Sequence, residues 1–128
     1  MQVKNEMKAY IMENPKENYV WKVRELIKAK AYRLTRHAEI ERDSDKISMI
    51  ELEEALLYNH SEIIEDYPED PRGHSFLILG FTREGQAIHA LCSIHEEYLV
   101  IITIYRPDAD LWIAWKMRRE KDENVSIL

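Results

Sequence analysis

The sequence is poor in glycine and proline and has no long apolar run. It contains 3 glycines and 4 prolines in 128 residues. This disfavours a sandwich or barrel of many hairpins, and also long disordered linkers. No apolar run approaches the roughly 18 residues that suggest a membrane-spanning helix. The first residues lack the apolar segment of a secretory signal peptide, so we expect a cytoplasmic protein.

Cysteine is almost absent, with Cys92 as the single example. One cysteine cannot form an internal disulfide, which agrees with a cytoplasmic location. Cys92 lies inside an apolar run, where an unpaired cysteine usually behaves as a small buried hydrophobe. We therefore expect no nucleophilic role for it.

Positive charge is outnumbered by negative charge, because 18 lysines and arginines stand against 24 aspartates and glutamates and leave a formal net charge of −6. Proteins that hold nucleic acid by bulk charge usually present a basic surface, so any RNA contact here requires a local basic patch. The acidic excess has two interpretations: it keeps the protein soluble, or it binds a basic partner protein. The sequence also lacks a glycine-rich phosphate loop, a nucleophile elbow and a dinucleotide fingerprint. The 5 histidines show no metal-ligand spacing, so we expect neither a metal nor a cofactor.

What is present is a series of helical patterns followed by strand patterns. Apolar spacing predicts a weak helix within 1–14 and a strong one from Asn18. Thr35 can cap a short helix, and Ser48 with Glu51 forms a capping box before a helix over 49–58. A final helix is predicted from Ala109 to about 121. Between these helices, four strands are predicted at 63–67, 75–81, 87–94 and 98–105.

These elements predict a single α+β domain. Short turns between the strands favour an antiparallel meander of about four strands, with the N-terminal helices packed on it and a C-terminal helix following. We divide the chain into an N-terminal helical extension (1–34), a core domain (35–112) and a C-terminal helix and tail (113–128).

Polar residues at the ends and edges of the apolar elements suggest cleavage of RNA through its own 2′-hydroxyl. This reaction needs a proton acceptor, a proton donor and cations that bind the phosphate. Histidine titrates near neutral pH, arginine binds phosphate through paired hydrogen bonds, and tyrosine can donate a proton or stack on a base. Candidates that could share one side of the sheet are Arg36, His37, Arg42, Lys46, Arg83, His89, Tyr105 and Arg106.

Each candidate also has a purely structural interpretation. His37 can cap or solvate the first turn of its helix, and a lone histidine in an apolar strand, such as His89, is more often a hydrogen-bonded core residue. Tyr105 and Arg106 end a buried strand, where ordinary surface residues are also common. Trp112 is expected to be a core or interface anchor.

The segment from Arg36 to Trp112 resembles the family called domain of unknown function 4258. The shared motifs are His-Ala near a helix start, Ile-Ser before a second helix, a strand ending in Asp-Tyr-Pro, an apolar hairpin, an Ile-His step and a closing Thr-x-Tyr-x-Pro-Asp with a following Trp. They stand at His37-Ala38, Ile47-Ser48, Ile63 to Pro68, Phe76 to Leu79, Ile88-His89, and Thr103 to Asp108 with Trp112.

That family is similar to the RelE-like ribonuclease toxins of bacterial toxin–antitoxin systems, and some members are encoded beside zinc-finger antitoxins. The resemblance implies a RelE/barnase-like architecture, metal-independent mRNA cleavage and neutralisation by an antitoxin protein. It makes His37, His89 and Tyr105 the expected catalytic residues. Arg42, Lys46 and Arg106 are the expected phosphate ligands.

The sequence departs from the family pattern in its charge. Glu41 stands where members often have arginine, and Asp45 and Lys46 occupy a second such position. These departures favour an alternative, a catalytically silent module that binds a partner or itself, as a homodimer, through the N-terminal helices and the Trp112 and Trp115 segment. A small-molecule-binding domain is a third hypothesis, for which the sequence offers no motif.

Overall fold

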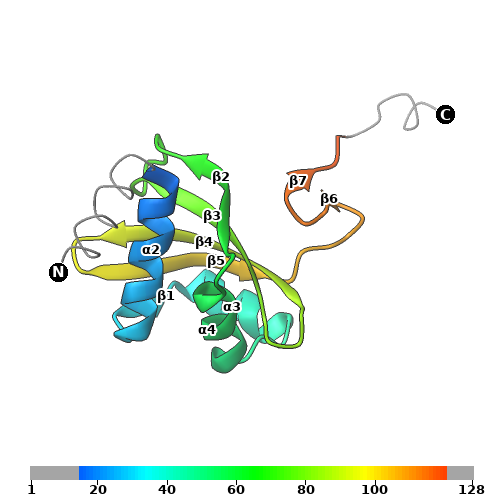
Figure 1. Cartoon of the computed structure of the whole chain (residues 1–128), viewed down its shortest axis with the longest axis horizontal. Helices are drawn as coiled ribbons and strands as arrows, with labels where there is room; N and C mark the ends of the chain where they lie inside the picture. The colour runs from blue at the N-terminus through cyan, green and yellow to red at the C-terminus, as the bar shows by residue number, and fades with distance from the viewer. Residues whose placement is uncertain (1–14, 121–128) are drawn as a thin grey trace.

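The computed structural model describes residues 15–120 as an α+β domain in which helices pack on a mixed β-sheet (Figure 1). The three helices of this part are α2 (Pro15–Lys28), α3 (Arg36–Ser44) and α4 (Met49–Leu57). The strands of the main sheet are β1 (Tyr32–Leu34), β2 (Glu62–Tyr67), β3 (Ser75–Phe81), β4 (Ala87–His95) and β5 (Tyr98–Tyr105). A separate small hairpin follows, formed by β6 (Trp112–Ile113) and β7 (Met117–Arg118).

The main sheet has the strand order β1-β5-β4-β3-β2. Strands β2 to β5 form the predicted antiparallel meander. The prediction of about four strands is incomplete, because β1 adds a fifth strand that pairs in parallel with β5. With three residues, β1 is too short to show an alternating pattern in the sequence.

A left-handed residue separates α2 from β1. Lys30 has a φ of 58°, and the backbone N–H of Ala31 donates to the carbonyl of Leu26 at 2.9 Å. This is the long bond that closes a Schellman-type helix end. The chain therefore leaves α2 sharply and enters β1 at once.

The predicted caps of α3 and α4 are present. The hydroxyl of Thr35 accepts from the Ala38 N–H at 3.0 Å and donates to the carbonyl of Ile102 at 2.7 Å, so it also ties the start of α3 to β5. Ser48 and Glu51 exchange side-chain-to-backbone bonds in a capping box. These local bonds fix where both helices begin.

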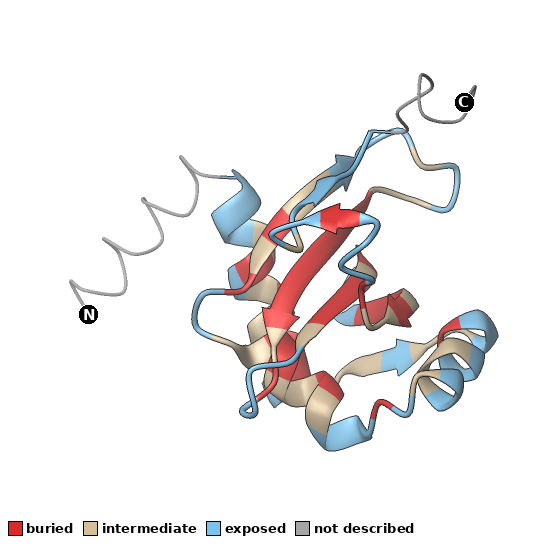
Figure 2. Cartoon of the chain, turned by 90° about the vertical axis from the view of Figure 1, so that its right-hand side faces the viewer, coloured by how far each residue is buried: buried red, intermediate tan, exposed pale blue. Residues whose placement is uncertain are grey.

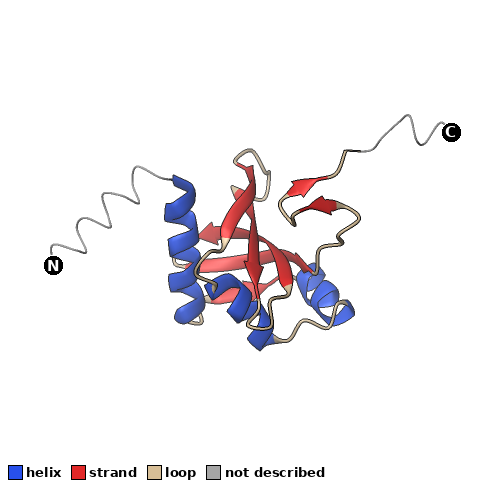
Figure 3. Ribbon diagram, turned by 45° about the vertical axis from the view of Figure 1, so that its right-hand side comes forward, coloured by secondary structure: helices blue, strands red, loops and turns tan. Residues whose placement is uncertain are grey.

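The helices cover one face of the sheet, and the main hydrophobic core lies between the helices and that face. Figure 3 shows the helices along one side of the sheet, and Figure 2 shows buried residues concentrated in its central strands. Helix α4 packs closely on β3, since a Cβ added at Gly80 would lie 1.9 Å from the carbonyl oxygen of Ala55. The core includes Val23, Ile27, Leu52, Leu56, Phe76, Ile78, Ala90, Ile101 and Ile104.

The predicted C-terminal helix from Ala109 is wrong within the described residues, because the β6–β7 hairpin occupies this stretch. Ala114 and Trp115 have φ values of 51° and 64°, which no α-helix accommodates. Trp112 is buried and packs edge-on against the ring of His89, with 4.4 Å between centroids. This tertiary contact prevails over the weak helical spacing of the apolar residues.

Two other predictions lie outside the described residues, namely the weak helix within 1–14 and the tail beyond 120. Among residues 15–120, no helix combines the length and apolar character required to cross a membrane.

Candidate active site

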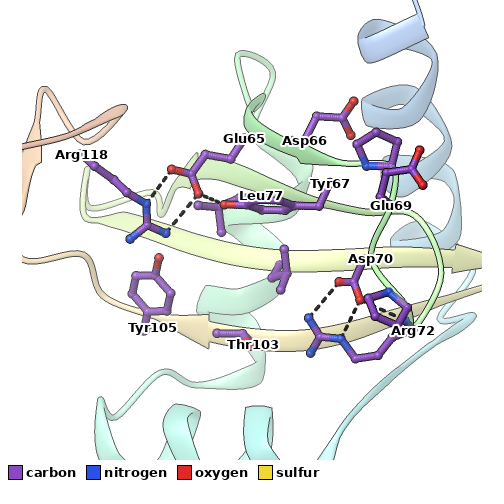
Figure 4. Close-up of a pocket in the computed structure, with 13 residues that line it drawn as sticks. Glu65, Asp66, Tyr67, Glu69, Asp70, Arg72, Leu77, Thr103, Tyr105 and Arg118 are labelled. Atoms are coloured by element: carbon purple, nitrogen blue, oxygen red, sulfur yellow. Dashed lines mark hydrogen bonds and ion pairs between the residues drawn. The ribbon is translucent and has the colours of Figure 1, made fainter.

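The sheet face opposite the helices carries a groove of about 670 Å³ (Figure 4). Side chains alternate between the two faces of a strand. In β3, Phe76 and Ile78 accordingly enter the helical core, whereas Leu77 lines the groove. The β2–β3 loop and strand β7 supply the two ends of the groove. Its polar and aromatic lining includes Glu65, Tyr67, Asp70, Arg72, Tyr105 and Arg118.

A tyrosine–histidine pair lies at the hairpin end of the groove. Tyr105 and His89 are cross-strand neighbours in β5 and β4. The Tyr105 hydroxyl is 3.1 Å from Nδ1 of His89, and Nε2 of His89 is 2.7 Å from the carbonyl oxygen of Trp115. Because a carbonyl can only accept, Nε2 carries the proton, and in the neutral ring Nδ1 accepts from the tyrosine.

Burial of both side chains determines which of them is protonated at neutral pH. His89 is fully buried, which lowers its pKa against the opposing effects of the Trp115 carbonyl and the Glu65 charge. Burial also raises the pKa of Tyr105 to about 12. At neutral pH the pair therefore consists of a protonated phenol and a neutral imidazole whose Nδ1 lone pair faces it.

A carboxylate–arginine pair stands beside Tyr105. The guanidinium of Arg118 binds Glu65 through Nε at 2.7 Å and through Nη2 at 3.1 Å, and it stacks over the Trp112 ring at 4.7 Å. The Tyr67 hydroxyl also donates a hydrogen bond to the Glu65 carboxylate. Burial of Glu65 opposes ionisation, but hydrogen bonds from Arg118 and Tyr67 outweigh it and lower the pKa of the carboxyl.

A second carboxylate–arginine pair lies at the other end of the groove (Figure 4). Arg72 binds Asp70 through Nε at 3.0 Å and through Nη2 at 2.8 Å, and Ser75 donates to the same carboxylate at 2.7 Å. The Arg72 hydrogen bonds, followed by that of Ser75, hold the pKa of Asp70 far below its usual range. The groove thus has an arginine at each end and apolar side chains in its floor.

The predicted catalytic residues do not all lie together. His89 and Tyr105 are in direct contact, as described above. His37 instead lines a different hollow near the start of α3, where its Nε2 is 3.3 Å from a carboxylate oxygen of Glu41. The structure therefore joins His89 to Tyr105 and places His37 in a neighbouring cavity.

The predicted phosphate ligands lie around the α3–α4 loop. Arg42 donates to the carbonyl of Ile47 at 2.9 Å and to Glu39 at 3.0 Å. Lys46 is exposed at a left-handed position with φ of 54°. The guanidinium of Arg106 donates to the carbonyls of two loop residues and to two side chains, namely Asp45, Lys46, Gln86 and Glu51. None of the three lines the groove.

Sequence reasoning missed four of the groove residues: Glu65, Tyr67, Arg72 and Arg118. Glu65 and Tyr67 could have been found from the alternation along β2, because the two side chains share a face. Arg118 gave no such signal, since it falls in a stretch expected to be helical. Its guanidinium binds the carboxylate of Glu65, which lies 53 residues earlier in the sequence.

Within residues 15–120, no three histidine, cysteine, aspartate or glutamate side chains are grouped closely enough to hold a metal ion. Cys92 is buried in the helical core, and burial raises the pKa of its thiol. The groove contains the phenol–imidazole pair and the two arginine–carboxylate pairs, and Asp66, Tyr67 and Glu69 also line it.

Fold and site together define an α+β domain with one sheet face covered by helices and one left open as a groove. The sequence model of the family described as domain of unknown function (DUF4258) matches residues 34–106. This is more than half of the chain, and the chain belongs to that family. The match runs from the end of β1 past the end of β5, and so includes His89 and Tyr105. No curated protein and no solved structure matches the chain.

Proposed function

We propose that this protein is a toxin-like endoribonuclease that cleaves mRNA in the open groove without a metal ion. The observation that carries the proposal is the Tyr105–His89 pair, with its unprotonated Nδ1, placed beside Arg118. It unites on one sheet face a proton acceptor and a phosphate-binding cation, which are two of the groups that cleavage through the 2′-hydroxyl requires.

In the proposed reaction, the 2′-oxygen of the substrate attacks the adjacent phosphorus. Its proton passes to the Tyr105 oxygen while the tyrosine proton passes to Nδ1 of His89. The bond from phosphorus to the 5′-oxygen breaks, and water protonates that oxygen. The products are a 2′,3′-cyclic phosphate and a 5′-hydroxyl, and water then takes the proton back from the pair. His89 acts through Tyr105, which agrees with its burial under Trp112.

The arginines at the two groove ends are suited to bind the phosphate backbone. Arg118 and Arg72 each contact their carboxylate through Nε and Nη2. Among the described residues, Nη1 of each has no hydrogen-bond partner. An arginine carries five N–H donors, so both can bind a phosphate while they keep their carboxylates. We therefore propose these two as phosphate ligands, in place of Arg42 and Arg106.

The relation that we infer between the DUF4258 family and RelE-like toxins implies the same activity, and it adds a partner. A toxin of this kind acts in the cytoplasm, where mRNA lies, and is held inactive by an antitoxin protein. The open sheet face is the surface that such an antitoxin would need to cover.

Expression in a bacterium, with transcript integrity as the readout, tests the proposal. We expect the wild-type chain to arrest growth and fragment mRNA, and Tyr105→Phe to abolish both effects because it removes the transferable proton. Tyr58→Phe is the matched control, since Tyr58 packs against Phe81 and His60 and lies outside the groove. Intact transcripts at high wild-type expression, or equal toxicity of Tyr105→Phe, would contradict the proposal.

A second candidate function is a catalytically silent interaction module. The exposed apolar residues of the hairpin segment favour it, since Leu111, Ile113 and Met117 are 62%, 44% and 65% exposed. Such residues suit a protein interface better than an RNA site. Light scattering after size exclusion tests self-association. A dimer that Met117→Glu converts to a monomer, together with no effect on RNA, would favour this function.

A further inference from the structure

A second hollow lies beside the groove, on the same open side of the sheet. Acidic residues line the groove, whereas the lining of the hollow has none. The hollow measures about 380 Å³, and its floor is formed by Val100 and Ile102 of β5, both buried. Basic and titratable side chains surround this floor, and none of the lining residues is acidic. The polar and aromatic lining consists of Arg33, Thr35, His37, Arg72, His95 and Tyr98.

Aromatic stacking positions Arg33 and His95 in the hollow, whereas Arg72 and His37 are paired with the carboxylates of Asp70 and Glu41. The guanidinium of Arg33 lies over the Tyr98 ring at 5.6 Å, and His95 stacks on the same ring at 5.8 Å between centroids. Within residues 15–120, the side chains of Arg33 and His95 have no hydrogen bond or ion pair. A cation positioned by an aromatic ring keeps its N–H donors available for an anion.

Arg72 connects the hollow to the groove, because it lines both cavities. One molecule that lies across the open face can therefore contact Tyr105 and Arg118 in the groove, pass Arg72, and reach Arg33. Arg118, Arg72 and Arg33 follow one another along this path, and four carboxylates line its groove part, namely Glu65, Asp66, Glu69 and Asp70. Tyr98, which is 38% exposed, positions Arg33 and His95 at the end of this path.

We infer that the hollow is a second subsite, which binds a flanking phosphodiester of single-stranded RNA through Arg33 and His95. This inference rests on the proposed ribonuclease function and extends it by stating how the substrate lies on the protein. It also gives His37, which does not reach the groove, a place near the substrate backbone. The hollow has no acidic residue in its lining, whereas four carboxylates line the groove, so the hollow is the part of the open face that suits a phosphate.

Fluorescence anisotropy with a labelled single-stranded oligouridine tests the inference. All variants are made in the full chain with Tyr105→Phe, so that binding is measured without cleavage. We expect Arg33→Gln to weaken binding about three- to tenfold and to reduce the slope of log Kd against log salt by about 0.7, the value for one phosphate contact on a single strand. His95→Gln is expected to weaken binding in the same direction.

Arg83→Gln is the matched control. Arg83 is exposed on the β3–β4 turn, pairs with Glu54 at 3.6 Å, and lines neither cavity. Binding by Arg33→Gln and His95→Gln that equals binding by this control, with the same salt slope, would overturn the inference. Should Arg33→Gln lower the thermal unfolding midpoint, His95→Gln decides the result.

The two proposals fail in different ways. Weakened oligouridine binding in Arg33→Gln, combined with no RNA cleavage by the wild-type chain, leaves the subsite standing and overturns the ribonuclease. Cleavage by the wild-type chain, combined with unchanged binding by Arg33→Gln and His95→Gln, overturns the subsite alone.

Discussion

The guanidinium of Arg106 connects parts of the chain that are distant in the sequence. It donates to the carbonyls of Asp45 and Lys46 in the α3–α4 loop, to Glu51 of α4 and to Gln86 before β4. Its backbone N–H also donates to the Asp45 carboxylate at 2.8 Å. An arginine that directly follows β5 and satisfies this many acceptors fixes the helical layer against the sheet.

We predict that Arg106→Ala lowers the free energy of unfolding by about 2–4 kcal/mol, because several acceptors, two of them backbone carbonyls, lose their donor. Arg83→Ala, at an exposed ion pair, should cost no more than about 0.5 kcal/mol. Urea denaturation measures both. A cost for Arg106→Ala no larger than for Arg83→Ala would show that these bonds contribute little.

His89 makes stability depend on pH. Burial lowers its pKa in the folded state, so the unfolded chain binds its proton more readily. The stabilising effect is complete above the ordinary histidine pKa of about 6.5 and is lost as the pH falls toward the lower folded value. Glu65 and Arg118 are the charged groups that influence this ring.

We therefore expect the wild-type free energy of unfolding to fall between pH 7.5 and pH 5.5, and to fall less in His89→Gln, which has no titrating ring. The carboxyl groups with lowered pKa, such as Glu51, Glu53 and Glu65, titrate below this window. Urea denaturation at both pH values provides the measurement. Parallel losses in the wild-type chain and the variant would contradict a buried neutral His89.

At the scale of elements, local signals allowed much of the fold to be predicted. The capping box at Ser48, the cap at Thr35 and the apolar runs of β3 and β5 depend on neighbours in the sequence, and the structure has all of them. Elements held mainly by distant contacts could not be predicted. Strand β1 exists because β5 pairs with it, and the β6–β7 hairpin because Trp112 and Trp115 contact His89.

The same distinction applies to the candidate site. His89 and Tyr105 stand in motifs that a sequence can show, whereas the contact between them requires the β4–β5 register. Arg118 reaches Glu65 only because the hairpin folds back over the sheet. A helix in that place would have hidden this side of the groove.

The crossing of α4 over β3 gives a prediction at this scale. We expect Gly80→Ala to cost about 1–3 kcal/mol of stability or more, since its Cβ would meet the backbone of Ala55 at 1.9 Å. Gly85→Ala is the control. It has a φ of +79° with open space around it, so it should cost about 1 kcal/mol from backbone strain alone.

Thermal or urea unfolding compares the two glycine variants. A Gly80→Ala chain as stable as Gly85→Ala would mean that α4 does not pack on β3 as closely as described.

At the scale of the whole molecule, the two faces of the sheet have different surroundings. One face is closed by helices and forms the core. The other is open, bordered by the β2–β3 loop and the hairpin, and carries the groove and the basic hollow. The net charge of −6 is that of the whole chain, whereas the proposed RNA binding depends on the local arginines of the open face, Arg33, Arg72 and Arg118.

The central claim is that this open face cleaves RNA by internal attack of the 2′-hydroxyl. Incubation of purified wild-type chain with single-stranded RNA in the presence of a metal chelator, followed by mass analysis of the fragment ends, tests it most directly. We predict fragments that end in 2′,3′-cyclic phosphate and begin with 5′-hydroxyl, and no fragments with Tyr105→Phe. RNA left intact by the wild-type chain, or cut equally well by Tyr105→Phe, would contradict the account.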